Sequence, residues 1–157
     1  MSFADDAFLQ RSVDLAREAL DTRNSPFASV LVGSDGTTLM EALNREGEGD
    51  PTSHPEFVLA RWAALNLDPS QRAGATVYTS GEHCAMCSAA HAWCGLGSIR
   101  YAASIPELWS WWDELELGEA PVSPLRIHEV APHIDAVGPS PQHSAQVREL
   151  IYLQFGK

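Results

Sequence analysis

Two short motifs in the sequence contain the residue types that most often do chemistry in proteins. The first is H-P-E at residues 54–56, and the second is C-A-M-C at residues 84–87. Zinc prefers nitrogen and sulfur ligands in a tetrahedral arrangement, and two cysteines three residues apart on a helix point to the same side. With His54 as a third ligand beside Cys84 and Cys87, one coordination position stays free for water, which is typical of a catalytic zinc site. The spacing therefore predicts one zinc ion per chain.

The glutamate of the first motif, Glu56, follows the histidine by two residues and is not needed as a ligand. Both motifs lie at the starts of predicted helices, where the positive end of the helix dipole stabilises thiolates. Two thiolates neutralise the charge of a zinc ion, and a water molecule on such an ion has a pKa of about 7 instead of roughly 16. The arrangement predicts that Glu56 moves protons in a hydrolytic reaction.

The cysteines of the second motif have other interpretations, which the sequence leaves open. They could be buried core thiols, or a thioredoxin-like redox pair, because a strand, a loop and C-x-x-C at a helix start is also that arrangement. A redox pair would leave the H-P-E motif without a role. The third cysteine, Cys94, is expected to fill the core.

The spacing of apolar residues and the positions of turn residues predict alternating helices and strands. Strands that alternate with helices indicate an α/β domain with helices on both faces of the sheet. No linker or repeat divides residues 1–157, which we expect to form a single domain. The expected helices are 4–22, 55–65, 84–93, 105–117 and 144–155, and the expected strands are 27–33, 37–43, 76–80, 98–102 and 127–130.

The composition is that of an ordinary globular protein, with 45% apolar and 20% charged residues. No apolar run reaches the roughly 18 residues that a membrane span needs, and the acidic N-terminus lacks the pattern of a secretory signal. Three cysteines are an odd number that does not suit a disulfide framework. We therefore expect a cytoplasmic protein that has no membrane partner.

The charge balance argues against a nucleic-acid ligand. The net charge is -11, and ten basic residues are scattered among twenty-one acids without a basic cluster. Proteins that grip nucleic acid usually carry a basic face. The single lysine is Lys157 at the end of the chain, which also disfavours a lysine Schiff base. A small molecule is the expected partner.

Further motifs extend from Pro26 to about Ala102. The stretch 26–30 resembles PFGAV, Asn44 with 50–54 resembles N…DPTAHAE, and 78–80 before the cysteines resembles YTSCEPC. Together with H-x-E and C-x-x-C they resemble the cytidine deaminase superfamily, in particular its guanine deaminase and tRNA adenosine deaminase branch. The chain departs from that pattern at Pro55, where alanine is usual, and at Gly81 and His83, where cysteine and proline are usual.

The resemblance implies a three-layer α/β/α sandwich with a five-stranded mixed sheet. It also implies that Glu56 serves a zinc-dependent hydrolysis that releases ammonia from a small heterocycle. The expected substrate is guanine or a cytosine- or triazine-type analogue. Editing of adenosine in tRNA is the alternative reaction, and the thiol redox protein is the alternative of a different class.

The substrate contacts are the least determined part of the site. The residues that the resemblance places at the ring are Phe27, Asn44, Pro55, Trp93 and Asp113. Phe27 and Trp93 are either core residues or walls of the base pocket, and Asn44 either caps a turn or binds the ring. Asp113 lies in an acidic run that is either a solvated face or, through Asp113 or Glu114, a contact to the base.

Apolar residues near the C-terminus predict an assembled protein. Trp109, Trp111 and Trp112 span too wide an arc to be buried on one helix face, so we expect a role in an interface, the core or a lid over the pocket. The stretch 150–155 is too apolar for a frayed end and should be docked on its own or a neighbouring subunit. The resemblance implies a homodimer in which this segment helps close the pocket.

Overall fold

The structure, a computed structural model, describes residues 1–156, and Lys157 lies outside the described residues. Its middle layer is a five-stranded sheet with the order β2-β1-β3-β4-β5. Strand β1 pairs antiparallel with β2 and β3, whereas β3, β4 and β5 run parallel. The strands are β1 (Ala28–Val32), β2 (Thr38–Leu43), β3 (Thr76–Gly81), β4 (Ser98–Ala103) and β5 (Ala136–Val137). The sheet is therefore mixed, as expected.

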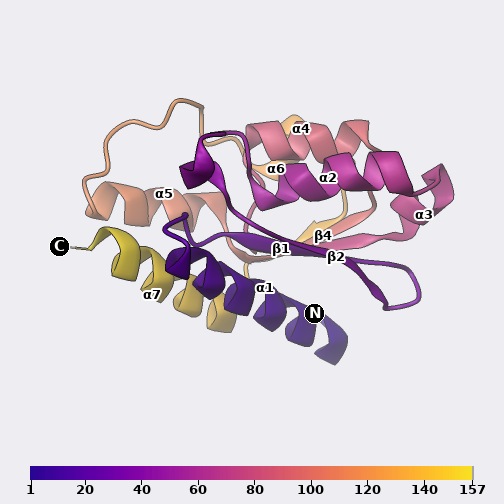
Figure 1. Cartoon of the computed structure of the whole chain (residues 1–157), viewed down its shortest axis with the longest axis horizontal. Coiled ribbons are helices and arrows are strands. Elements are labelled where there is room, and N and C mark those ends of the chain that lie inside the picture. The colour runs from indigo at the N-terminus through magenta and orange to yellow at the C-terminus, as the bar shows by residue number, and fades with distance from the viewer. Residues whose placement is uncertain (157) are drawn as a thin grey trace.

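Helices cover both faces of this sheet (Figure 1). Helices α1 (Phe3–Asp21) and α7 (Pro141–Phe155) pack on one face, and α2 (Pro55–Asn66) packs with α4 (Ala85–Trp93) on the other. The remaining helical segments are η1 (Glu46–Glu48), α3 (Pro69–Gly74), α5 (Ile105–Glu114) and α6 (Ile127–Val130). The predicted three-layer sandwich is confirmed. None of these helices has the length and apolar character needed to cross a membrane.

The interior strand β1 shows why the sheet needs cover on both sides. All five of its residues are buried, and successive side chains of a strand point to opposite faces. Val30 and Val32 join the apolar cluster under α1 and α7, whereas Leu31 joins the cluster under α2 and α4. Two cores, one on each face, therefore hold the sheet in place.

The structure corrects the C-terminal part of the predicted element order. Residues 127–130, expected to be a strand, form helix α6, and the fifth strand is the short β5 instead. The amide of Ile127 at the start of α6 donates to Oε1 of Glu82 at 3.2 Å, so a distant carboxylate caps this segment as a helix. Helix α3 was not expected, although Asp68 caps it and Pro69 occupies its first turn.

Two loop-to-helix transitions position the polar residues. Strand β2 ends at Leu43, and the chain passes through η1 to the start of α2. Strand β3 ends at Gly81, and the chain reaches α4 after three further residues. Because α2 and α4 pack on each other, their N-terminal ends lie together, as Figure 1 shows.

Candidate active site

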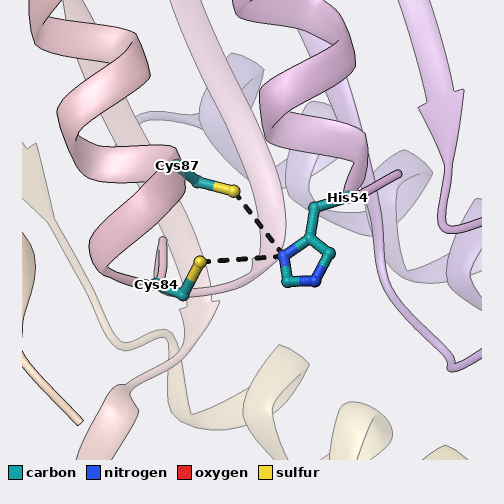
Figure 2. A group of neighbouring side chains, drawn as sticks. All are labelled: His54, Cys84 and Cys87. Carbon is teal, nitrogen blue, oxygen red and sulfur yellow. Dashed lines mark hydrogen bonds between the residues drawn. The ribbon is translucent and has the colours of Figure 1, made fainter. Parts of the chain in front are cut away.

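The first residues of α2 and α4 bring three candidate metal ligands together. The ligand atoms of His54, Cys84 and Cys87 all lie within 4.8 Å of one another. Nδ1 of His54 is 3.7 Å from each sulfur, and Figure 2 shows the ring pointing at both. A tetrahedral zinc ion, with bonds of about 2.0 Å to nitrogen and 2.3 Å to sulfur, places these atoms roughly 3.5 Å apart. The three residues therefore fit zinc.

The local sequence explains why these side chains converge. His54 is the N-cap of α2 and is followed by Pro55, and Cys84 is the N-cap of α4. Cys87, in the first turn of α4, is fully buried. Unpaired N–H groups and the positive dipole end of both helices thus face the site, which favours anionic sulfur.

Hydrogen bonds among the three ligands shift their pKa values. The neighbouring Cys87 and the His54 ring lower the pKa of the Cys84 thiol to about 4. The contact with Cys84 raises the pKa of His54 to about 9. The bond to Cys84, together with burial, raises the pKa of the Cys87 thiol. Without metal, the site is therefore a thiolate paired with an imidazolium and a second, protonated thiol.

Glu56 lies beside these ligands and is held by one of its two oxygens. Its Oε1 accepts hydrogen bonds from Thr79 Oγ1 at 2.7 Å and Ser29 Oγ at 3.1 Å. The Glu56 carboxyl also interacts with the Cys87 thiol, and it lines a cavity. Burial raises the pKa of this carboxyl, which suits a group that both takes and gives protons near neutral pH.

A cavity of about 530 Å³ opens above the ligands and Glu56. This volume lies within the range of ordinary small-molecule sites. Its floor is polar, and most of its wall is apolar. The apolar wall includes Phe27, Met86, Ile105, Leu108, Trp109, Trp112, Val122, Ile151 and Phe155.

Asn44 combines the two roles that its position suggested. Its Oδ1 accepts the backbone N–H of Glu46 at 3.0 Å, so it does cap a turn. Because that bond fixes which end of the amide is oxygen, the Nδ2 group is the end left for other partners. Asn44 also lines the cavity, so the side chain can offer a donor to a ring.

Phe27 lines the cavity, and the departure at Gly81 explains how it fits. A Cβ atom at residue 81 would lie 3.1 Å from Phe27 Cε1 and 3.3 Å from Leu108 Cδ1. Glycine therefore lets these two walls approach the end of β3. Pro55 is buried and also lines the cavity.

Two expected substrate contacts do not reach this cavity within one chain. The Trp93 side chain is 90% exposed at the end of α4. Asp113 faces a neighbouring shallow depression instead, and Glu114 binds Arg148 and Tyr152 on α7. Neither Trp93 nor Asp113 is among the residues that line the cavity of this chain, and their contact with a substrate stays a prediction. His83 is buried against His91, with ring centroids 5.3 Å apart, and does not line the cavity.

The C-terminal aromatic residues are part of the cavity wall. Trp111 is buried in the core, whereas Trp109 and Trp112 line the cavity. Phe155 of α7 lies over Trp112, with ring centroids 6.0 Å apart, and lines the cavity with Ile151. The terminal segment is therefore docked on its own subunit.

Sequence reasoning missed two carboxylates, Glu46 and Glu82, that line the cavity. Glu82 has a side chain only 1% exposed. Its Oε2 accepts a hydrogen bond from the backbone N–H of Ile105 at 2.8 Å. Its Oε1 accepts hydrogen bonds from the backbone N–H of Ile127 at 3.2 Å and from Nε of Arg126 at 3.4 Å. It thus ties the metal-ligand loop to the starts of α5 and α6. For Glu82, its position just before the cysteine motif was a signal that the sequence offered. Glu46 lies in a polar loop, where the sequence offered no such signal.

Comparisons with known proteins agree with this geometry. Residues 3–103 match the cytidine and deoxycytidylate deaminase zinc-binding region. The chain is 33% identical to a probable cytosine deaminase of Schizosaccharomyces pombe over 107 residues, which are 66% of this chain. It is 36% identical to the guanine deaminase of Bacillus subtilis over 100 residues, or 62% of this chain. The chain spans 63% and 64% of the length of these two relatives.

Among solved structures, the protein NE0047 in complex with 2,6-diaminopurine has the same fold. The TM-score is 0.74 at 23% identity, and the match covers 96% of this chain and 80% of that one. The family match spans more than half of the 157 residues and contains His54, Cys84 and Cys87. The chain therefore belongs to the cytidine and deoxycytidylate deaminase family, and these three residues are positioned to bind its zinc ion.

Proposed function

We propose that this chain is a zinc-dependent hydrolase that releases ammonia from a small aminated heterocycle. The observation that carries the proposal is the placement of Glu56. One of its oxygens is fixed by two hydroxyl groups, and it lies at the floor of a cavity beside three metal ligands. An acid-base group, a metal position and a space for a ring are thus in one place.

The proposed reaction exchanges water for ammonia at one ring carbon. When bound, zinc supplies Lewis-acid activation of a water molecule. Glu56 takes a proton from the water molecule, and the water oxygen attacks the ring carbon that bears the amino group. Glu56 passes this proton to the ring nitrogen, then takes the second proton from the hydroxyl group now bonded to the carbon and gives it to the departing amine. The C–N bond breaks as the C=O bond forms, and ammonia leaves. The raised pKa of Glu56 keeps both directions of proton transfer accessible.

The chain's other cavity residues would orient the ring. Phe27 and Leu108 offer apolar faces against which a planar heterocycle can pack. Asn44 Nδ2 offers a donor to a ring acceptor. The net charge of -11 favours a small free base over tRNA, since a nucleic-acid site needs cations for the phosphates.

An ammonia-release screen with the zinc-loaded protein tests the reaction and the class of substrate. The panel should hold purines, pyrimidines, nucleosides and aminotriazines, with an inosine assay on tRNA and a disulfide-reduction assay beside it. We expect ammonia release from at least one free base, and neither inosine formation in tRNA nor disulfide reduction. Thiol-disulfide exchange without ammonia release would favour the redox interpretation, and inosine formation would favour tRNA editing.

We also propose that the chain forms a homodimer through the outer side of α2 and α4. Leu65 and Trp93, near the ends of these adjacent helices, are 77% and 90% exposed. Large exposed apolar side chains often mark interfaces. Sedimentation should give a dimer that Trp93→Ala weakens. A monomer at micromolar concentration would contradict this proposal without affecting the proposed reaction.

The cellular location is a further part of the proposal, which places the protein in the cytoplasm. Cys84, Cys87 and Cys94 are all free thiols. Free thiols are usual in a reducing compartment.

A further inference from the structure

We propose that Glu46 makes this site select heterocycles that carry a second hydrogen-bond donor, such as a second exocyclic amino group. The heterocycles that we expect the site to disfavour carry a ring carbonyl where the preferred ones carry the second amino group. The inference rests on the proposed function and names its substrate class. It follows from the balance of donors and acceptors around the cavity.

Three of the side-chain donors along the cavity are already engaged. The Thr52 hydroxyl donates to Asp50 Oδ1 at 2.7 Å, and the Trp112 indole donates to Gly118 O at 2.8 Å. The Ser25 hydroxyl donates to Glu46 itself. Pro55, where the resembled family has alanine, has no N–H group at all. The Asn44 amide and the Trp109 indole are the cavity donors without a hydrogen bond within residues 1–156, so they remain for the acceptors of a substrate.

The Glu46 carboxylate is held in place while part of it stays open. Its backbone N–H is fixed by Asn44 Oδ1 at 3.0 Å, and its Oε1 is held by the Ser25 hydroxyl. The other oxygen, Oε2, lies 3.9 Å from Nε2 of His54, which is longer than a hydrogen bond. The side chain is 35% exposed and lines the cavity. Oε2 is thus an acceptor with room for another donor.

Among the basic side chains of residues 1–156, only the His54 imidazole lies at ion-pair distance from this carboxylate, at 3.9 Å. The nearby Arg45 pairs with Glu48 at 3.9 Å, and within residues 1–156 no arginine or lysine lies at ion-pair distance from Glu46. A substrate amino group or protonated ring nitrogen would donate to Oε2 and gain a charge-assisted hydrogen bond. A carbonyl oxygen at the same place would set lone pairs against the carboxylate. Repulsion of this kind is an effective means of specificity.

Two matched pairs of compounds test the selection without assuming the ring type. Guanine and 2,6-diaminopurine differ in one oxygen that becomes an amino group, and so do cytosine and 2,4-diaminopyrimidine. We expect kcat/KM to favour the diamino member of at least one pair by about ten- to hundredfold, the range of a hydrogen bond to a charged group. In Glu46→Gln this ratio should fall toward one, because an amide can either donate or accept.

The control is Glu48→Gln, in the same short helix η1 but paired with Arg45 on the surface and outside the cavity lining. It should leave the ratio unchanged. A preference of the natural protein for the carbonyl member of both pairs would overturn the proposal, and so would a ratio that Glu46→Gln does not move.

Equilibrium binding of the same pairs, followed by tryptophan fluorescence, separates this proposal from the reaction. Diamino-selective binding without ammonia release would refute the deaminase proposal and support this one. Ammonia release with a preference for the carbonyl compounds would support the deaminase proposal and refute the role of Glu46. Absence of both binding and release would overturn both proposals.

Discussion

The two sides of the cavity differ in origin and in chemistry. Residues before position 104 form the floor, which holds His54, Glu56 and Cys84, and they also contribute Phe27 and Met86 to the apolar wall. The opposite wall comes from α5, the segment 120–122 and the end of α7, and it is largely apolar. The family match ends at residue 103, so it covers the floor and leaves the opposite wall out. We infer that the shared floor sets the reaction, whereas the wall, together with Glu46, sets the substrate.

The two sides are also held in different ways. Buried hydroxyls of Ser29 and Thr79 fix the floor carboxylate Glu56. The wall depends on Glu82, which binds the first amides of α5 and α6. Changes in the floor should therefore stop the reaction, and changes in the wall should alter binding.

The largest effect on turnover is expected for Glu56→Gln on the floor. It removes the proton carrier but none of the three metal ligands, so kcat should fall by about 10² to 10⁴-fold while the zinc content stays at one per chain. Steady-state kinetics and elemental analysis measure the two quantities. Ser29→Ala removes one of two hydroxyls on Oε1 and should cost much less. Near-normal kcat in Glu56→Gln would refute the assigned role.

Zinc affinity should rise steeply with pH, because the metal-free floor holds two protons. His54, with its pKa raised to about 9, and Cys87, with its raised pKa, are both protonated at pH 7. Cys84, with its pKa lowered to about 4, is not. Zinc must displace both protons, so its apparent affinity should increase about 100-fold per pH unit between pH 5 and 8. Chelator competition at several pH values measures this, and a pH-independent affinity would contradict the charge state.

Glu82→Gln tests whether the wall is positioned separately from the floor. The amide keeps one acceptor oxygen where the carboxylate has two for its three N–H donors. We therefore expect a loss of about 1–3 kcal/mol in unfolding free energy and a roughly tenfold higher KM with little change in kcat. Glu107→Gln is the matched control, since Glu107 also caps the start of α5 through Ser104 and binds Ser144 of α7. Within residues 1–156 no hydrogen bond joins its side chain to the metal-ligand loop. It should lower stability without raising KM. Equal changes in KM for both variants would show that the effect is only structural.

The smallest effect is expected for Phe155→Ala at the far end of the wall. Its ring covers Trp112 and lines the cavity, so its loss should raise KM a few-fold and leave zinc content and kcat unchanged. A large fall in kcat would mean that the wall takes part in the reaction and would break the distinction between the two sides.

The same division describes what could be predicted from sequence. The three metal ligands and, apart from the short segments η1 and α3, the elements through β4 follow from local spacing, and the structure has them in these places. The error at residues 127–130 has a different origin, because Ile127 begins a helix through a bond to Glu82, 45 residues away. Periodicity within four residues carries no sign of such a partner.

The central claim is that water replaces an amino group at the floor of this cavity. The most direct measurement is mass spectrometry of the product formed in oxygen-18-labelled water from the heterocycle that releases ammonia fastest. We predict one labelled oxygen in the product for each ammonia released, with neither formed by Glu56→Gln. An unlabelled product, or equal turnover by that variant, would contradict the account.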